Sequence, residues 1–309
     1  QTDQPQERSS GTGHHILLGM TEITTTKSYR IDCPSEQLLP IVLASPHSGD
    51  YYPPDLIKKT SLTPHQLRRS EDAFVDQLYE PAVANGVPLI RARLGRVFVD
   101  LNREPYELDP GMFDGPLPAY ANTRSPRLAA GLGTIAKVIA SGETIYADRL
   151  AFKDVSALLD TYYKPYHDAL SNLLIETKKR FGMAILIDCH SMPSSVGLPG
   201  ALKGRAVDFV LGDCHRSSCD AGVTALVDRH LERLGYRVLR NRPYAGGYTT
   251  QQYGRPSKGV HALQVEINRA LYMDEARIEP LPSVKKLSQQ LSDLVEALGR
   301  SYLSAAAAE

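Results

Sequence analysis

Short apolar runs alternate along the chain with longer segments in which apolar residues recur every three or four positions. The first pattern is typical of buried strands, and the second is typical of helices with one buried face. We expect strands at 23–29, 38–45, 87–92, 96–101, 184–191, 208–213, 236–241 and 261–269. We expect helices at 70–86, 149–181, 219–235 and 283–303, the first with Ser70 as its N-cap. This alternation predicts an α/β fold with helices on both faces of the sheet.

Two segments show neither pattern. Segment 104–121 holds four prolines and two glycines, and segment 243–256 is rich in turn-forming residues, so both are predicted to be loops. No internal repeat and no Gly/Ser linker divides the sequence, which favours a single domain over 16–309. The preceding residues 1–15 are polar, lack an apolar signal-peptide core, and are expected to form a disordered tail.

Composition excludes several classes of partner. The chain has 309 residues with 35 Lys and Arg against 35 Asp and Glu, which gives no reason to expect nucleic acid or an anionic membrane surface. No run approaches the roughly 18 apolar residues of a membrane span. The 4 cysteines are too sparse for a disulfide framework, which favours a reducing cytoplasm. Cys214, His215 and Cys219 lie close together, but their spacing matches no standard zinc motif.

Polar residues that could carry chemistry stand at the ends of predicted strands, where ligands collect in α/β sheets. They are His47 in SPHSG, Asn102 and Arg103 in VDLNRE, His190 in DCHS, and Glu266 in LQVEINR. Two carboxylates, Glu71 and Asp72, follow Ser70 at the start of the first predicted helix.

Two histidines and a carboxylate are the ligand set of a catalytic zinc site, whose open fourth position holds water. Zinc lowers the pKa of that water to about 7, which makes it a nucleophile for an amide carbon. Arg103 is suited to an oxyanion or to a substrate carboxylate. Glu266 could move a proton from the water to the leaving nitrogen.

Each of these residues also has a purely structural interpretation. A single histidine at a strand end is more often a surface residue than a ligand, and acids at a helix start interact favourably with the helix dipole. Arg103 could pair with Asp100 or Glu104. Glu266 is harder to explain this way, because a buried carboxylate without a partner is costly.

Taken in order, eight segments resemble the N-formylglutamate amidohydrolase family. They are SPHSGDYYP, LRRSEDAFVDQLY, FVDLNREPYELDPGMF, YYKPYHDAL, LIDCHSMPS, DFVLGD, PYAGGYTTQQYGRP and LQVEINRALYMDE. The resemblance covers about 40–275 and implies a mixed sheet flanked by helices, similar to the zinc carboxypeptidases (phosphorylase/hydrolase-like). It also implies one zinc ion, bound at the strand ends.

The resemblance implies His47 and His190 as metal ligands, with Asp72 as the preferred carboxylate. Glu71 is the alternative within the SED stretch. Asp50 is a second alternative, because His47 to Asp50 imitates the H-x-x-E spacing of the carboxypeptidases.

The family reaction is hydrolysis of N-formyl-L-glutamate to formate and L-glutamate, a late step in one route of histidine breakdown. The resemblance implies Glu266 as the catalytic glutamate and the pair Asn102 and Arg103 for the substrate carboxylate or oxyanion. Further candidate contacts to this dianionic substrate are Arg124, Tyr248, Arg255 and Arg269. Two alternatives remain: hydrolysis of another N-acyl amino acid or short peptide, and a non-catalytic binding protein. No oligomeric state is predicted.

Overall fold

A mixed sheet of seven strands forms the centre of the molecule in the computed structural model, which describes residues 27–196 and 206–306. Its order is β1 (Tyr29–Asp32), β3 (Leu89–Ala92), β2 (Ile41–Ser45), β4 (Ala184–Met192), β7 (Val260–Asn268), β5 (Phe209–Gly212) and β6 (Val238–Arg240). β1 is antiparallel to β3 and β5 is antiparallel to β7, whereas all other neighbours are parallel. The predicted mixed α/β sheet is confirmed, and the tail predicted at 1–15 lies outside the described residues.

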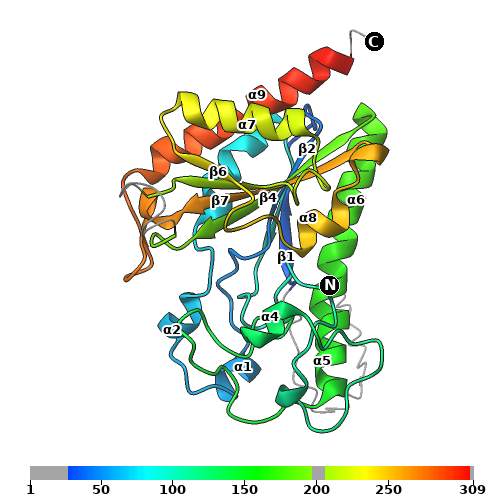
Figure 1. Cartoon of the computed structure of the whole chain (residues 1–309), viewed down its shortest axis with the longest axis vertical. Helices are drawn as coiled ribbons and strands as arrows, with labels where there is room; N and C mark the ends of the chain where they lie inside the picture. Colours follow the sequence, from blue (N-terminus) through cyan, green and yellow to red (C-terminus); the bar gives the residue numbers. More distant parts are fainter. Residues whose placement is uncertain (1–26, 197–205, 307–309) are drawn as a thin grey trace, which may run out of the picture.

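Helices cover both faces of this sheet. The α-helices of the described residues are α1 (Pro54–Lys58), α2 (Pro64–Arg68), α3 (Val75–Tyr79), α4 (Pro126–Ala129), α5 (Phe152–Leu158), α6 (Lys164–Phe181), α7 (Ala221–Arg233), α8 (Tyr248–Tyr253) and α9 (Val284–Ala306). Helices α3, α7 and α9 pack on one face, and α6 and α8 pack on the other (Figure 1). A two-stranded pair, β8 (Met273–Asp274) with β9 (Glu279–Pro280), lies outside the main sheet.

The alternation of side chains in β2 explains the two layers. Ile41 and Leu43 enter the core beneath α3 and α9, whereas Val42 and Ala44 enter the core beneath α6. A strand covered on both faces is apolar at every position, as the sequence pattern of β2 and β4 requires. Among the described residues, no helix is long and apolar enough to cross a membrane.

The long helices were predicted well, but the first predicted helix starts too early. α3 begins at Val75, because Phe74 adopts a left-handed φ of 66° that a helix cannot include. Ser70 is therefore not an N-cap, and its Oγ instead accepts a hydrogen bond from the Ala140 amide at 3.0 Å. The segment predicted at 149–181 forms α5 and α6, joined by a π-helical turn at Leu159–Tyr163.

Residues 93–151, called here the loop region, lie below the sheet in Figure 1 and contain few regular elements. The strand predicted at 96–101 is wrong, since this segment turns, with the Phe98 amide donating to the Gly95 carbonyl at 2.9 Å. Its apolar side chains, including Val97, Val99 and Leu101, are buried in the core between β2 and α6. Burial against loops, rather than strand pairing, accounts for the apolar pattern.

Candidate active site

The ends of three parallel strands bring the chemistry-bearing residues together. His47 follows β2, while His190 and Glu266 are paired directly across the β4–β7 register. Side chains of paired residues point to the same face of a sheet, so these two lie next to each other. After His47 the chain turns tightly against the loop region, where a Cβ at Gly49 would lie 2.3 Å from the Leu94 carbonyl oxygen. Only glycine allows this close approach.

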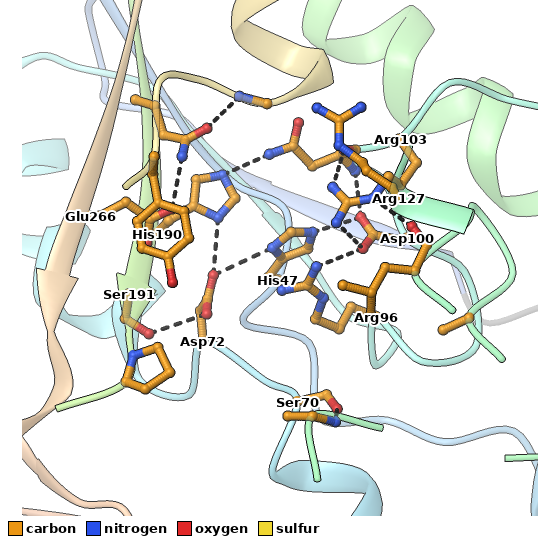
Figure 2. A pocket seen from close by; sticks show the side chains of 18 of the residues that line it. His47, Ser70, Asp72, Arg96, Asp100, Arg103, Arg127, His190, Ser191 and Glu266 are labelled. Carbon is orange, nitrogen blue, oxygen red and sulfur yellow. Dashed lines mark hydrogen bonds and ion pairs between the residues drawn. The ribbon is translucent and has the colours of Figure 1, made fainter. Parts of the chain in front are cut away.

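The side chains of His47, Asp72 and His190 converge in the interior (Figure 2). Asp72 Oδ2 lies 3.0 Å from His190 Nδ1 and 3.3 Å from His47 Nδ1. One ligand atom from each residue lies within 4.8 Å of the others, and all three residues are buried. Among the described residues, His47 Nδ1 is a buried nitrogen without a hydrogen-bond partner. A metal ion would satisfy it, so the donor set fits a metal site.

The two alternative carboxylates lie elsewhere. Glu71 accepts hydrogen bonds from Tyr52 and Arg68, and it lines a separate cavity together with Asp50. In the part of the chain that the structure describes, His47, Asp72 and His190 form the only group of three His, Cys, Asp or Glu residues that could hold a metal. The segment with Cys214, His215 and Cys219 forms no such group, and all four cysteines are free.

A second carboxylate stands behind each histidine. His47 Nε2 donates to Asp100 Oδ1 at 2.7 Å, and His190 Nε2 lies 3.0 Å from Asp188 Oδ1. Asp100 holds the proton on His47 Nε2 and leaves the Nδ1 lone pair for a metal. Asp188 Oδ1 makes no hydrogen bond within the described residues, but its negative charge lies beside the His190 ring. Sequence reasoning assigned neither role. For Asp188 the signal was present, because residues two apart in a strand share a face.

Burial and neighbouring charges set the ionisation of this cluster. Burial opposes charge on Asp72, but its contacts with His190 and His47 outweigh this effect and hold the Asp72 pKa well below its usual range. The pKa of His190 is raised well above its usual value, because the Asp188 and Asp72 carboxylates outweigh desolvation. Asp100 is likewise kept ionised, since Arg96 and His47 lower its pKa against the effect of burial. Asp72 and Asp100 therefore supply negative charge for a divalent cation, whose binding would displace a proton from His190.

Glu266 lies across the cluster from His47 (Figure 2). Burial raises its pKa to about 8, and nearby Asp72 adds to the rise while His190 opposes it. Gln264 Nε2 donates to Glu266 Oε1 at 2.7 Å, and Gln264 Oε1 accepts from the Gly247 amide at 2.6 Å. Strand β7 thus fixes both this carboxyl group and the loop at 243–247.

Asn102 connects β4 to the start of α8. Its Nδ2 lies 3.0 Å from His190 Nε2, and its Oδ1 accepts from the Thr249 amide at 2.7 Å. A Cβ at Gly247 would lie 2.5 Å from Nδ2 of the Asn102 side chain, so glycine is required there. Asn102 lines the cavity, but its hydrogen bonds orient His190 and α8.

The cluster opens into a cavity of about 540 Å³ whose wall contains four arginines: Arg96, Arg103, Arg127 and Arg269. Arg103 donates through Nε to the Leu132 carbonyl and through Nη1 to the Asn102 carbonyl, each at 2.8 Å. Figure 2 shows Arg96, Arg103 and Arg127 grouped on the side of His47, across from Glu266. The cavity therefore combines a possible metal site with a cationic wall.

The structure does not place three candidate substrate contacts in this wall. Arg124 is exposed before α4, and Arg255 is exposed with its Nη1 donating to the Gln251 and Gly254 carbonyls. Tyr248 packs in α8 against His167, with ring centroids 5.7 Å apart. Arg269 does line the cavity and donates to Asp72 Oδ1 at 3.1 Å.

Sequence reasoning missed Arg96 and Arg127, although both line the cavity. Both belong to the loop region: Arg96 lies in an irregular segment, and Arg127 lies in α4, whose four residues are too few to show a helical sequence pattern. The segment holds several arginines, and nothing in their spacing distinguishes those that line the cavity.

The fold and site together define a class: an α/β protein with a buried His-Asp-His group that could bind a metal, open to a cavity with a cationic wall. Comparison with known proteins narrows this class. The family model for N-formylglutamate amidohydrolase matches residues 39–273. The chain belongs to the N-formylglutamate amidohydrolase family, a family of enzymes.

Individual relatives cover nearly the whole chain. An N-formylglutamate deformylase of Pseudomonas putida is 29% identical over 273 residues, which are 86% of this chain and 93% of that protein. The deformylase of Pseudomonas aeruginosa is 28% identical over 85% of this chain and 94% of its own length. The crystal structure of N-formylglutamate amidohydrolase from Ralstonia eutropha has a TM-score of 0.83 and 33% identity, and the match covers 89% of this chain and 98% of that one.

Proposed function

We propose that this protein hydrolyses N-formyl-L-glutamate to formate and L-glutamate, with one zinc ion held by His47, Asp72 and His190. The observation that carries the proposal is the meeting of a buried potential metal site and four arginines in one cavity. The substrate requires both, because it has an amide to be cleaved and two carboxylates to be bound. The names of the relatives from Pseudomonas and Ralstonia support this choice of substrate.

Zinc bound at this site would supply Lewis-acid activation of water and of the formyl carbonyl. The chain's own residues would do the remaining work. Asp100 orients the His47 ring through Nε2, and Asn102 orients the His190 ring through Nε2. Arg269, which donates to Asp72 Oδ1 and to the Ser191 hydroxyl, holds the carboxylate in place.

Glu266 would accept a proton from the attacking water and deliver it to the leaving nitrogen. Its pKa of about 8 lies near neutral pH, where a group can both accept and release a proton. Its hydrogen bond with Gln264 fixes its orientation, and its pairing with His190 across the sheet places it beside the cluster.

Arg103 would bind the oxyanion or the substrate carboxylate nearest the amide. Its Nη2 is not committed to a main-chain carbonyl and lies 4.0 Å from Asp100 Oδ2. Arg103→Ala separates the two roles: loss of an oxyanion contact lowers kcat, whereas loss of a ground-state carboxylate contact raises KM. Full activity of this variant would exclude both roles.

The test is metal analysis of protein purified after metal-replete expression, combined with a formate-release assay. We expect about one zinc per chain and turnover of N-formylglutamate that exceeds turnover of N-acetylglutamate, N-acetylaspartate and a carboxypeptidase substrate. A preference for one of the others would identify a different N-acyl or peptide hydrolase. Zinc near zero with no turnover would favour a binding protein. Histidine degradation and a cytoplasmic location are part of the same proposal.

A further inference from the structure

We propose that Arg127 binds the side-chain carboxylate of the substrate and thereby selects acidic N-acyl amino acids. This inference rests on the proposed function and adds a specificity residue that the family-derived candidates did not include. Four features support it: Arg127 has free donors, its backbone is fixed, the surrounding cavity wall is positively charged, and Arg127 lies at some distance from the reacting centre.

The donors of Arg127 are free, whereas each of the other arginines in the wall uses at least one donor on a neighbouring group. Arg96 donates to Asp100 at 2.7 Å, and Arg269 donates to Asp72 at 3.1 Å. Arg103 uses Nε and Nη1 on main-chain carbonyls. Among the described residues, the Arg127 guanidinium makes no hydrogen bond, and its nearest charged partner, Glu107 Oε2, lies 3.9 Å from Nη1. It can therefore offer a planar two-point grip to a carboxylate.

The backbone of Arg127 is nevertheless fixed. Ser125 caps α4 by accepting a hydrogen bond from the Arg127 amide at 3.2 Å. The Arg127 carbonyl accepts from the Leu132 amide at 3.0 Å, and the Leu132 carbonyl in turn accepts from Arg103 Nε. The turn from Arg127 to Leu132 thus fixes the Arg127 backbone and also holds the Arg103 side chain, while the Arg127 guanidinium stays free. This arrangement suits ligand binding, because little backbone freedom is lost.

The charge of this wall is unbalanced. Three arginines (Arg96, Arg103 and Arg127) face two carboxylates, Asp100 and Glu107, and the second of these is already engaged by the Ser125 hydroxyl. Desolvation lowers the pKa of Arg103, and the positive charges of Arg96 and Arg127 add to this effect. An incoming carboxylate would compensate the remaining positive charge, which favours an anionic substrate group at this wall.

Arg127 lies farther from the reacting centre than Arg103. Asp100, which bonds directly to His47, pairs with Arg96 and lies near Arg103, whereas Arg127 faces Glu107. The Arg127 side chain is 36% exposed, against 11% for Arg103.

In N-formylglutamate the α-carboxylate is next to the amide, and the other carboxylate lies beyond two methylene groups. The outer arginine therefore meets the remote carboxylate. Leu132, Ala136 and Val138, which line the same cavity, can cover the methylene groups.

The test compares Arg127→Gln with the parent enzyme on N-formyl-L-glutamate and on N-formyl-L-glutamine, whose side chain has the same shape without the charge. We expect kcat/KM for N-formylglutamate to fall about 10- to 100-fold, the usual range for a lost charged hydrogen bond. The value for N-formylglutamine should stay within about twofold, since the neutral amide gains little from the cation. Arg127→Lys should give an intermediate loss.

Arg124→Gln is the matched control, because Arg124 is exposed in the same segment and does not line the cavity. This variant should leave kcat/KM unchanged for both substrates. An equal loss on both substrates in Arg127→Gln, or no loss on either, would overturn the assignment.

A binding measurement separates this inference from the proposed reaction. Calorimetry with the zinc-loaded protein should show tighter binding of L-glutamate than of L-glutamine, and Arg127→Gln should abolish the difference. This result would support the assignment even if the parent enzyme failed to hydrolyse N-formylglutamate, in which case only the proposed reaction would fall. No preference in the parent protein, or an unchanged preference in the variant, would refute it.

Discussion

The site has two halves that are built differently. One half, with His190 and Glu266, stands on paired strands of the central sheet, and the other, with Arg96, Arg103 and Arg127, comes from the loop region. A paired register fixes the direction of each side chain, whereas loop residues depend on many separate contacts. The sheet thus holds the groups that must stay rigid, and the loops hold those that we assign to the substrate.

The sheet half follows closely from the sequence. An apolar run that ends in polar residues predicts a buried strand with its functional side chains at the emerging end, and β4 fits this pattern. In β7, apolar and polar residues instead alternate from Leu263 to Asn268. The pairing of His190 with Glu266 has no local signal, because register depends on strands far apart in the chain. For the same reason, the sequence alone left Asp72, Glu71 and Asp50 as alternative ligands.

The loop half was predicted poorly. Arg124 was chosen from the segment whose cavity residue is Arg127, since only the cap by Ser125 and the turn to Leu132 decide which side chain faces inward. Other contacts hold the segment at 96–101 as buried loop rather than strand, among them the hydrogen bond from the Asp100 amide to the Thr134 carbonyl at 2.8 Å. Tertiary contacts overrode local propensity in both places.

The largest expected effect is on the sheet half. His190→Ala removes a metal donor from a buried cluster and should abolish zinc binding and nearly all turnover. Circular dichroism should show a folded protein, and metal analysis measures the loss. His65→Ala, at an exposed position in α2, is the control and should keep both. Unchanged zinc content in His190→Ala would mean that the metal lies elsewhere.

Glu266→Gln should leave the sheet half of the site folded and able to bind zinc, but it should remove the group that transfers the proton. Glutamine can still accept the hydrogen bond from Gln264, so fold and zinc content should persist. We expect kcat to fall about a hundred- to ten-thousandfold, the usual contribution of a general acid–base group. A variant that keeps more than half the parent rate would contradict this role for Glu266.

Asp100 lies where the two halves meet, since it accepts from His47 on one side and from Arg96 on the other. Asp100→Asn should lower zinc affinity or activity about 10- to 100-fold, as carboxylates behind metal ligands usually do. Competition with a chelator measures the affinity. Asp109→Asn, which removes a peripheral ion pair with Lys137 in the same region, should have no such effect. Equal affinities in the two variants would show that the halves work independently.

The smallest expected effect concerns how α6 supports the loop half. His167 Nε2 donates to the Leu101 carbonyl at 3.0 Å, and Nδ1 lies 2.8 Å from the Tyr253 hydroxyl, which also donates to the His167 carbonyl at 3.2 Å. Burial lowers its pKa to about 4, well below the usual value of about 6.5. As the pH falls, the unfolded chain takes up a proton on His167 before the folded protein does. The contribution of neutral His167 to the free energy of unfolding is therefore complete above pH 6.5 and is lost as the pH falls toward 4.

The loss should reach roughly 2 kcal/mol by pH 5, since each unit of pKa difference corresponds to about 1.4 kcal/mol. Urea unfolding at pH 7.5 and pH 5 measures it in the parent protein, in His167→Gln and in His65→Gln. The remaining titrating groups contribute equally to all three proteins. The contribution of His167 is therefore the difference between the proteins in how much the free energy of unfolding changes from pH 7.5 to pH 5. His167→Gln should be less stable than the parent at pH 7.5, because its two hydrogen bonds are disturbed, yet it should lose less on acidification. His65→Gln should follow the parent. Identical slopes in the parent and His167→Gln would mean that this histidine takes up its proton in the folded protein as readily as in the unfolded chain, and that the carbonyl beside Asn102 is held by other contacts.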